Sequence, residues 1–166
     1  ALTPEPIRLD FWIPHIIEEF EVRATDRQQV LTTEIEAPLP AVHTDSDVFR
    51  KILTELLTNA CKYTPPGERI HVQVGQQNHG VQIQVTNFGS YISPDYLPFI
   101  FDKFYRVPSG DRWKQGGTGL GLTLAQKLSH RLGGTLEVSS TVEKTTFSLS
   151  LPVVGDGREW GVMSGE

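Results

Sequence analysis

The stretch Ser46-Asp-Val-Phe-Arg-Lys-Ile-Leu-Thr-Glu-Leu-Leu-Thr-Asn-Ala-Cys-Lys-Tyr63 carries the strongest helix signal in the chain. Its apolar residues recur at helical spacing, which places them on one face of a helix. They are Val48, Ile52, Leu53, Leu56, Leu57 and Ala60. Asp45 or Ser46 can cap the start, and the run from Thr64 to Gly67, with its two prolines, ends the pattern. The sequence therefore predicts a helix over residues 47–63 with one buried face.

A polar stripe lies beside that apolar face and consists of Glu55, Asn59 and Lys62. A carboxylate and an amide one turn apart offer oxygen ligands to Mg²⁺, which takes few protein ligands and completes its shell with water and phosphates. A lysine one turn further on can neutralise phosphate charge. The same spacing fits a solvated helix face that extends to Lys51, so the stripe alone leaves both interpretations open.

Working outward from this helix, the chain alternates strands and further helices. Helical spacing recurs from Pro14 to about Asp26 and from about Thr118 to Leu132. Extended segments are predicted at Ile7 and Leu9, at 29–35 and at 42–43. Two hairpins are predicted further along the chain: residues 70–74 pair with 81–85 around a turn at 75–80, and residues 136–138 pair with 147–151. Both hairpins alternate apolar with polar residues, which indicates a sheet with one wet face. We expect an α/β (α+β) two-layer sandwich, in which about three helices cover one face of a mixed, mostly antiparallel sheet.

Three further segments carry residues suited to binding. Four glycines lie in the run Gly116-Gly-Thr-Gly-Leu-Gly-Leu122 at the start of the last helix, where backbone amides and the helix N-terminus can hold an anion. No Gly-Lys-Ser/Thr follows, and no strand precedes the run, so it is neither a Walker A loop nor a dinucleotide fingerprint. The run Asn87 to Ile92 joins a side chain that can pair with a base edge to a glycine turn. The aromatic run Phe101 to Arg106 also fits a small satellite core beneath a loop.

Taken together and in this order, the four segments resemble the N, G1, F and G2 boxes of sensor histidine kinases. The resemblance covers about residues 6 to 152 and implies the Bergerat ATP-binding fold. It implies that Asn59 binds Mg²⁺, that Lys62 and Tyr63 lie beside the phosphates or ribose, and that 107–116 form a lid. The remaining ATP-binding residues that it implies are Asn87, Gly89, Ile92, Phe101, Tyr105, Arg106, Gly117, Thr118, Gly119, Leu120, Gly121 and Leu122.

The resemblance also implies an activity and partners. ATP, with Mg²⁺, would donate its γ-phosphoryl group by in-line transfer to a histidine on upstream dimerisation helices, and then to a response regulator. None of the five histidines lies in the family's acceptor setting, so we expect the chain to be a fragment: linker 1–5, catalytic domain 6–152, flexible tail 153–166. Two alternatives are a degenerate domain that senses nucleotide or docks a protein, and an anti-sigma-type serine kinase, against which the F box argues.

The G1 segment departs from the family pattern Asp-x-Gly-x-Gly at Asn87 and Tyr91. Asparagine can accept a bond from the adenine amino group but lacks the stronger charge-assisted part. We therefore expect weak ATP binding, reduced about five- to tenfold by the asparagine. Tyr91 would add to this if its position requires a positive φ or close approach of the backbone to the base. Since asparagine can also donate, guanine is a second base to test.

Glu55 has two functional interpretations. In related ATPases a glutamate four residues before the metal asparagine activates water, so Glu55 can act as a general base for hydrolysis. We favour a role in the metal shell or in positioning water. With Asn59 it forms the expected catalytic pair.

Composition sets the outer limits. The 166 residues carry a net charge of −5 and contain no block of five like charges, which argues against sequence-independent nucleic-acid binding. No apolar run approaches the roughly 18 residues of a membrane span, and Cys61, the single cysteine, points weakly to a reducing compartment. We expect a monomeric, cytoplasmic domain that makes no membrane contact of its own, within a parent protein that is either soluble or membrane-anchored.

Overall fold

A computed structural model describes residues 1–105 and 120–153. Along the chain it contains β1 (Glu5–Ile7), α1 (Leu9–Asp26), β2 (Val30–Ile35), β3 (Val42–Thr44), α2 (Ser46–Tyr63), β4 (Arg69–Gln77), β5 (Gly80–Phe88), the short 3-10 helix η1 (Leu97–Phe99), α3 (Gly121–Arg131), β6 (Thr135–Ser140) and β7 (Lys144–Pro152). The order of helices and strands agrees with the sequence-based prediction.

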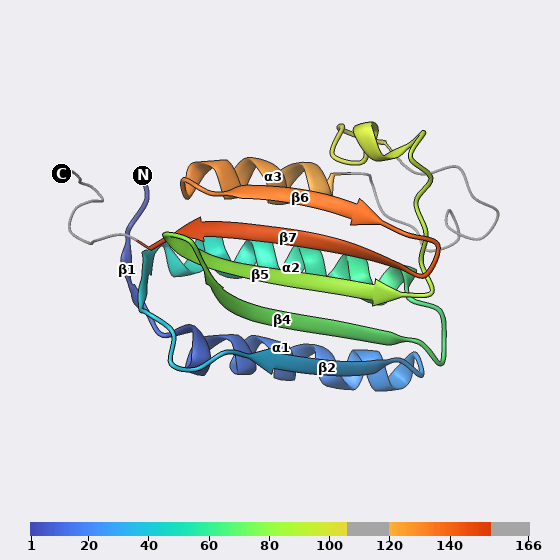
Figure 1. Cartoon of the computed structure of the whole chain (residues 1–166), viewed down its shortest axis with the longest axis horizontal. Coiled ribbons are helices and arrows are strands. Elements are labelled where there is room, and N and C mark those ends of the chain that lie inside the picture. The colour runs from blue at the N-terminus through green and yellow to red at the C-terminus, as the bar shows by residue number, and fades with distance from the viewer. Residues whose placement is uncertain (106–119, 154–166) are drawn as a thin grey trace.

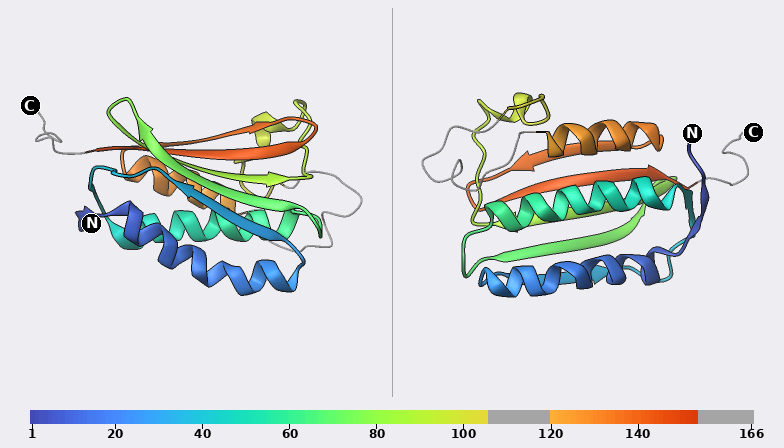
Figure 2. Two further views of the ribbon diagram at one scale, coloured as in Figure 1. Left: turned by 60° about the horizontal axis from the view of Figure 1, so that its bottom comes forward. Right: turned by 180° about the vertical axis from the view of Figure 1, so that it is seen from behind.

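The main sheet has five strands in the order β2-β4-β5-β7-β6 (Figure 1). Its β2–β4 pair is parallel and the other pairs are antiparallel, whereas β1 and β3 form a separate antiparallel pair. All three α-helices lie on one face of the sheet, as the turned views in Figure 2 show. The expected two-layer sandwich is confirmed.

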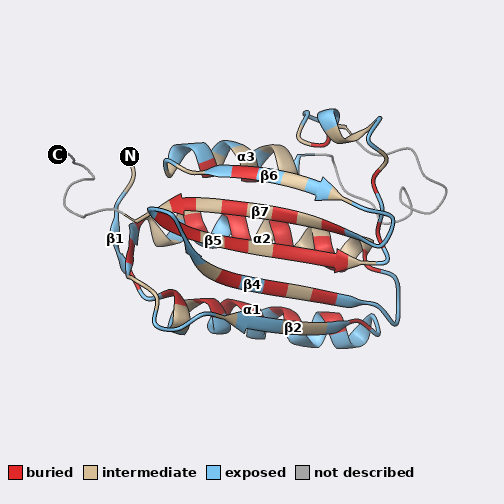
Figure 3. Cartoon of the chain, viewed as in Figure 1, coloured by how far each residue is buried: buried red, intermediate tan, exposed pale blue. Residues whose placement is uncertain are grey.

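The core lies between α2 and the inner face of the sheet (Figure 3). Helix α2 starts with a side-chain cap, because Oδ1 of Asp45 accepts a bond of 3.1 Å from the Val48 N–H. Its apolar face is fully buried at Phe49, Ile52 and Leu56. The Phe49 ring also stacks on Trp12 of α1 at 4.5 Å between ring centroids. These contacts fix α2 as the central helix.

Helix α1 begins earlier than the sequence pattern indicates. It starts at Leu9, which we placed in an extended segment, and carries Pro14 inside the helix. Leu9 is fully buried and Ile13 is 1% exposed, so the first turn extends the apolar face of the helix into the core. Burial of these side chains outweighs the one backbone hydrogen bond that proline removes near the start of the helix.

The first hairpin is longer than predicted. Strands β4 and β5 reach Gln77 and Gly80, so only Asn78 and His79 form the turn, with Asn78 at φ 48°. A Cβ at Gly80 would collide with the Leu151 carbonyl of β7, which explains the glycine at that position. No helix in the described part of the chain is long and apolar enough to cross a membrane.

Candidate functional site

Three elements that carry the predicted site residues meet at one end of the molecule. The C-terminal half of α2, the end of β5 and the start of α3 converge there (right side of Figure 1). A Cβ placed on Gly89 would lie 2.8 Å from Cγ of Glu68, in the loop that follows α2. One placed on Gly121 would lie 2.6 Å from Oε1 of Glu55. The N, G1 and G2 segments are therefore neighbours in space.

The polar stripe of α2 faces this meeting point. Asn59, Lys62 and Tyr63 are half-buried, and the Glu55 side chain is 21% exposed. Nζ of Lys51 lies 3.0 Å from Oε2 of Glu55, one helical turn away. The stripe is thus partly enclosed by neighbouring segments, which a freely solvated helix face is not.

The last turn of α2 is held by the turn between α1 and β2. Nε2 of Gln29 donates to the Cys61 carbonyl at 2.8 Å and to the Thr64 carbonyl at 2.6 Å. Nε of Arg27 donates to the same Cys61 carbonyl at 2.8 Å. These bonds satisfy carbonyls that a helix C-terminus leaves without partners. They fix the direction in which Asn59 and its neighbours project. The Cys61 side chain is itself buried, and this burial raises the pKa of its thiol.

Asn87 lies near the end of β5 with its side chain in the interior. The residue is 2% exposed, and its Oδ1 has no hydrogen-bond partner among the described residues. Its register partner on β7 is Thr145, whose hydroxyl donates to the Ser90 carbonyl at 3.0 Å and lies 2.8 Å from Oγ of Ser140. Asn87 is therefore left with a buried acceptor that these neighbours do not satisfy.

Thr145 is a residue of this site that the sequence analysis missed. It is 1% exposed and occupies an inward position of β7 whose next inward residues are Phe147, Leu149 and Leu151. A polar residue at the head of an apolar alternation is the signal that would have identified it.

In the G1 turn, the positive φ falls on a glycine and not on Tyr91. Gly89 has a φ of 74° and donates its N–H to the Glu143 carbonyl at 2.8 Å. Tyr91 does not have a positive φ, so its backbone carries no strain of that kind. The residue is 46% exposed. Ile92 is buried, and its N–H donates to Oγ of Ser140 at 2.8 Å.

The aromatic segment after η1 divides between core and surface. The Phe101 ring packs edge-on against Phe147 at 6.1 Å, which fits a satellite core. Tyr105 lies 5.8 Å from the Phe99 ring, and burial raises the pKa of its hydroxyl. Phe104 is 65% exposed and has a φ of 66°.

The G2 segment is described from Leu120 onward. Leu120 is 37% exposed, whereas Leu122 packs against the core. Oγ1 of Thr123 donates to the Phe101 carbonyl at 2.8 Å, which links α3 to the aromatic segment. The predicted site residues Arg106, Gly117, Thr118 and Gly119, and the predicted lid at 107–116, lie outside the described residues, as does the tail from residue 154.

Comparison with known families shows to which family the chain belongs. A family model described as histidine kinase-, DNA gyrase B-, and HSP90-like ATPase matches residues 44–155, which is more than half of the chain. The chain belongs to this ATPase family.

Several named relatives of this ATPase domain are sensor kinases. The sensor histidine kinase CusS of Escherichia coli O157:H7 is 40% identical over 111 residues, which are 67% of this chain and 23% of CusS. The adaptive-response sensory kinase SasA of Synechococcus elongatus is 31% identical over 154 residues, or 92% of this chain and 39% of SasA. The chain spans less than half the length of either relative.

The fold is shared with the catalytic domain of a solved histidine kinase. The catalytic domain of histidine kinase ThkA superposes with a TM-score of 0.81 at 20% identity, covering 92% of this chain and 97% of that domain. The chain is therefore the counterpart of the catalytic, ATP-binding domain of sensor histidine kinases.

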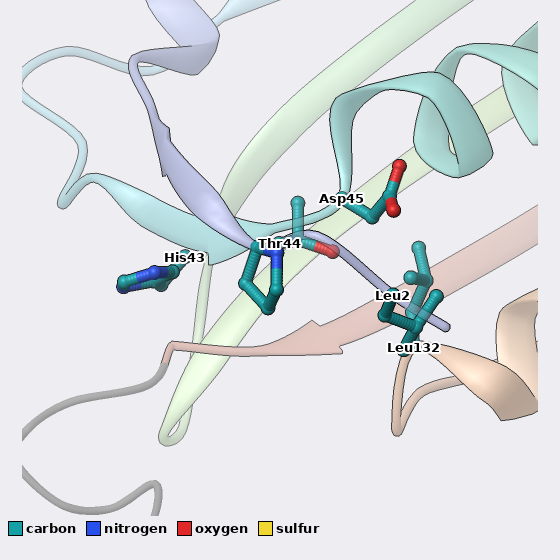
Figure 4. Close-up of a pocket in the computed structure, with 6 residues that line it drawn as sticks. Leu2, His43, Thr44, Asp45 and Leu132 are labelled. Carbon is teal, nitrogen blue, oxygen red and sulfur yellow. The ribbon is translucent and has the colours of Figure 1, made fainter.

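Other features of the ATPase domain lie away from this site. Figure 4 shows a pocket lined by Leu2, Pro4, His43, Thr44, Asp45 and Leu132, at the opposite end of α2. Backbone hydrogen bonds from Thr3 and Val48 to Asp45 hold the pKa of that carboxyl below its usual range. The five histidines occupy α1, β3, β4, the β4–β5 turn and α3.

Proposed function

We propose that the chain binds ATP and transfers its γ-phosphoryl group to a histidine on a separate dimerisation domain, from which the group passes to a response regulator. The observation that carries this proposal is the buried Oδ1 of Asn87, which has no partner among the described residues. An acceptor without a partner in the interior costs free energy, which a donor from a ligand recovers. The amino group of adenine is such a donor.

Asn59 is the residue that we propose for Mg²⁺. Its amide oxygen suits this ion, which needs only one or two protein oxygens beside phosphate and water ligands. No cluster of three His, Cys, Asp or Glu side chains among the described residues offers a competing metal site. When bound, the ion supplies positive charge that stabilises the phosphates during transfer.

The other side chains of the site would position the nucleotide. Lys62 and Tyr63 follow Asn59 on the last turn of α2, where an ammonium group can neutralise phosphate charge. In the transfer, a nitrogen of the acceptor imidazole bonds to the γ-phosphorus as the bond to the bridging oxygen of ADP breaks. The contribution of the domain is to hold these groups in line.

The partners belong to the proposal as well. The acceptor helices and a response regulator are both expected in the cytoplasm. ThkA, whose catalytic domain shares this fold, has been solved in complex with the response regulator protein TrrA. This supports the same class of partner here.

Autophosphorylation tests the proposal directly. The full parent chain with its upstream helices should incorporate label from γ-labelled ATP into an acid-labile, base-stable phosphoryl-histidine. Asn59→Ala should abolish labelling, and Gln73→Ala, on the open face of the sheet, serves as the control. Nucleotide binding without labelling would instead establish the degenerate, nucleotide-sensing alternative.

Asn87→Asp tests the adenine-binding role. A carboxylate adds a charge-assisted bond to the adenine amino group, so affinity should rise about five- to tenfold. The measurement is calorimetric titration with Mg²⁺ and a non-hydrolysable ATP analogue, and the wild-type chain should bind weakly. Gln84→Glu, on the same strand but facing the open side, is the matched control.

Two results would contradict this role. Equal affinity of the wild type and Asn87→Asp would remove Asn87 from base recognition, and low-micromolar affinity of the wild type would show that asparagine carries no cost. Titration with the GTP analogue decides the guanine hypothesis, which requires tighter binding than that of ATP.

A further inference from the structure

Glu55 and Gly121 meet across the interface between α2 and α3. A Cβ on Gly121 would lie 2.6 Å from Oε1 of Glu55, so the end of the Glu55 side chain would have to shift away from α3 to admit a side chain at this position. Gly121 does not have a positive φ, so its backbone conformation does not require glycine. The nearby Glu55 carboxylate explains the glycine at this position better. Helix α3 begins at this residue.

The start of α3 lacks the features that normally stabilise a helix N-terminus. Its N-cap is Leu120, which makes no side-chain cap, and its first turn contains no acidic residue. The first four N–H groups of a helix have no partner within the helix, and together they carry partial positive charge. The Glu55 carboxylate, supplied by α2, brings negative charge to this end.

The two oxygens of Glu55 face different groups. Oε2 lies 3.0 Å from Nζ of Lys51, and Oε1 is the atom that faces Gly121. A general base needs an oxygen free to take a proton from water within hydrogen-bonding distance. With Lys51 on one side and α3 on the other, this carboxylate is arranged for an electrostatic contact between helices.

We propose that Glu55 is a positioning residue, which holds the start of α3, from Leu120 to Leu122, against α2 and thereby aligns it with Asn59. The inference rests on the proposed function and assigns Glu55 a role other than base or metal ligand. Helix α3 has a second tie at the same end, the 2.8 Å bond from Thr123 to the Phe101 carbonyl. Glu55 adds the link to the helix that carries Asn59.

A double-mutant cycle tests the contact. Glu55→Ala and Gly121→Ala should each weaken binding of a non-hydrolysable ATP analogue with Mg²⁺ by roughly three- to tenfold. The methyl group that Gly121→Ala adds occupies space that Glu55→Ala vacates, so the double variant should bind no more weakly than either single variant. Glu55→Gln retains an oxygen and should recover part of the loss. Glu137→Ala, an exposed glutamate on β6, is the control.

Amide hydrogen exchange measures the same contact without nucleotide. Exchange at Leu122–Ala125 should accelerate in Glu55→Ala and Gly121→Ala, while amides of β4 and β5 remain protected. Faster exchange throughout the chain would indicate general destabilisation and overturn the proposal. The proposal would also be overturned if the affinity losses of the two single variants multiplied in the double variant. Loss of ATPase turnover in Glu55→Gln at unchanged nucleotide affinity would overturn it as well, because that result is expected of a general base.

The two measurements separate this proposal from the proposed function. If the wild-type chain binds no nucleotide, the proposed function fails, yet accelerated exchange at the start of α3 would still support the contact. If nucleotide binds and exchange at α3 is unchanged in both single variants, the positioning role alone is wrong.

Discussion

At the scale of single residues, the two departures of the G1 turn from the family pattern differ in burial, because Asn87 is 2% exposed and Tyr91 is 46% exposed. Asn87 keeps the buried acceptor but lacks the charge, so its effect falls on affinity. Tyr91 causes no backbone strain, because the position that needs positive φ is Gly89. Gly89 is also enclosed by Glu68 and Pro65. Two requirements, conformation and space, therefore act on the same glycine.

Gly89→Ala and Gly67→Ala separate these requirements. Both glycines have positive φ, 74° and 89°, but a Cβ on Gly67 would meet nothing within 4 Å. Each alanine should lower the free energy of unfolding by about 1–2 kcal/mol through strain. Gly89→Ala should cost more, and should weaken ATP binding, because Glu68 must move. Urea denaturation measures the first effect, and equal losses would show that the contact with Glu68 is unimportant.

At the scale of elements, α2 is fixed at both ends by side chains from outside the helix. Asp45 caps its start, and Gln29 and Arg27 bind carbonyls of its last turn. Gln29 is 6% exposed, so its bonds form away from water. The helix that carries Asn59 therefore depends on the turn between α1 and β2 for its position.

Gln29→Ala should loosen that end of the helix. It removes both Nε2 bonds and leaves the Thr64 carbonyl without this donor, so the free energy of unfolding should fall by about 1–3 kcal/mol. ATP affinity should fall with it, since Asn59 and Lys62 lie on the same turns. The measurements are chemical denaturation and calorimetric titration. Gln73→Ala, exposed on the open face, is the control, and a result equal to this control would exclude the positioning effect.

At the scale of the whole molecule, the helices and the five-stranded sheet share a hydrophobic core. Phe49 is one of its largest fully buried side chains and stacks on Trp12, and so joins α2 to α1. The wet face of the sheet carries polar pairs instead, such as Thr86 with Thr146, whose hydroxyls are 2.9 Å apart. The apolar contacts are therefore concentrated on the helix side of the sheet.

Phe49→Ala should be among the most damaging single substitutions. It leaves a cavity between two helices, which should lower the free energy of unfolding by about 3–5 kcal/mol. Val142→Ala, at a residue that is 79% exposed, should change it by less than about 0.5 kcal/mol. Thermal and urea unfolding compare the two, and a small effect at Phe49 would contradict the assignment of the core.

The helix at residues 47–63, the two hairpins and the layer arrangement could be predicted from the sequence, because they follow from short-range periodicity of apolar residues. The same periodicity placed Asn59 beside the core. Packing between distant segments instead sets the start of α1 at Leu9, leaves Asn87 with an unpartnered acceptor among the described residues, and brings Thr145 opposite Asn87. The contact of Glu55 with Gly121 also depends on tertiary packing, because the two residues are 66 positions apart in the sequence. Such features depend on which distant segments pack together, and local pattern carries no information about that packing.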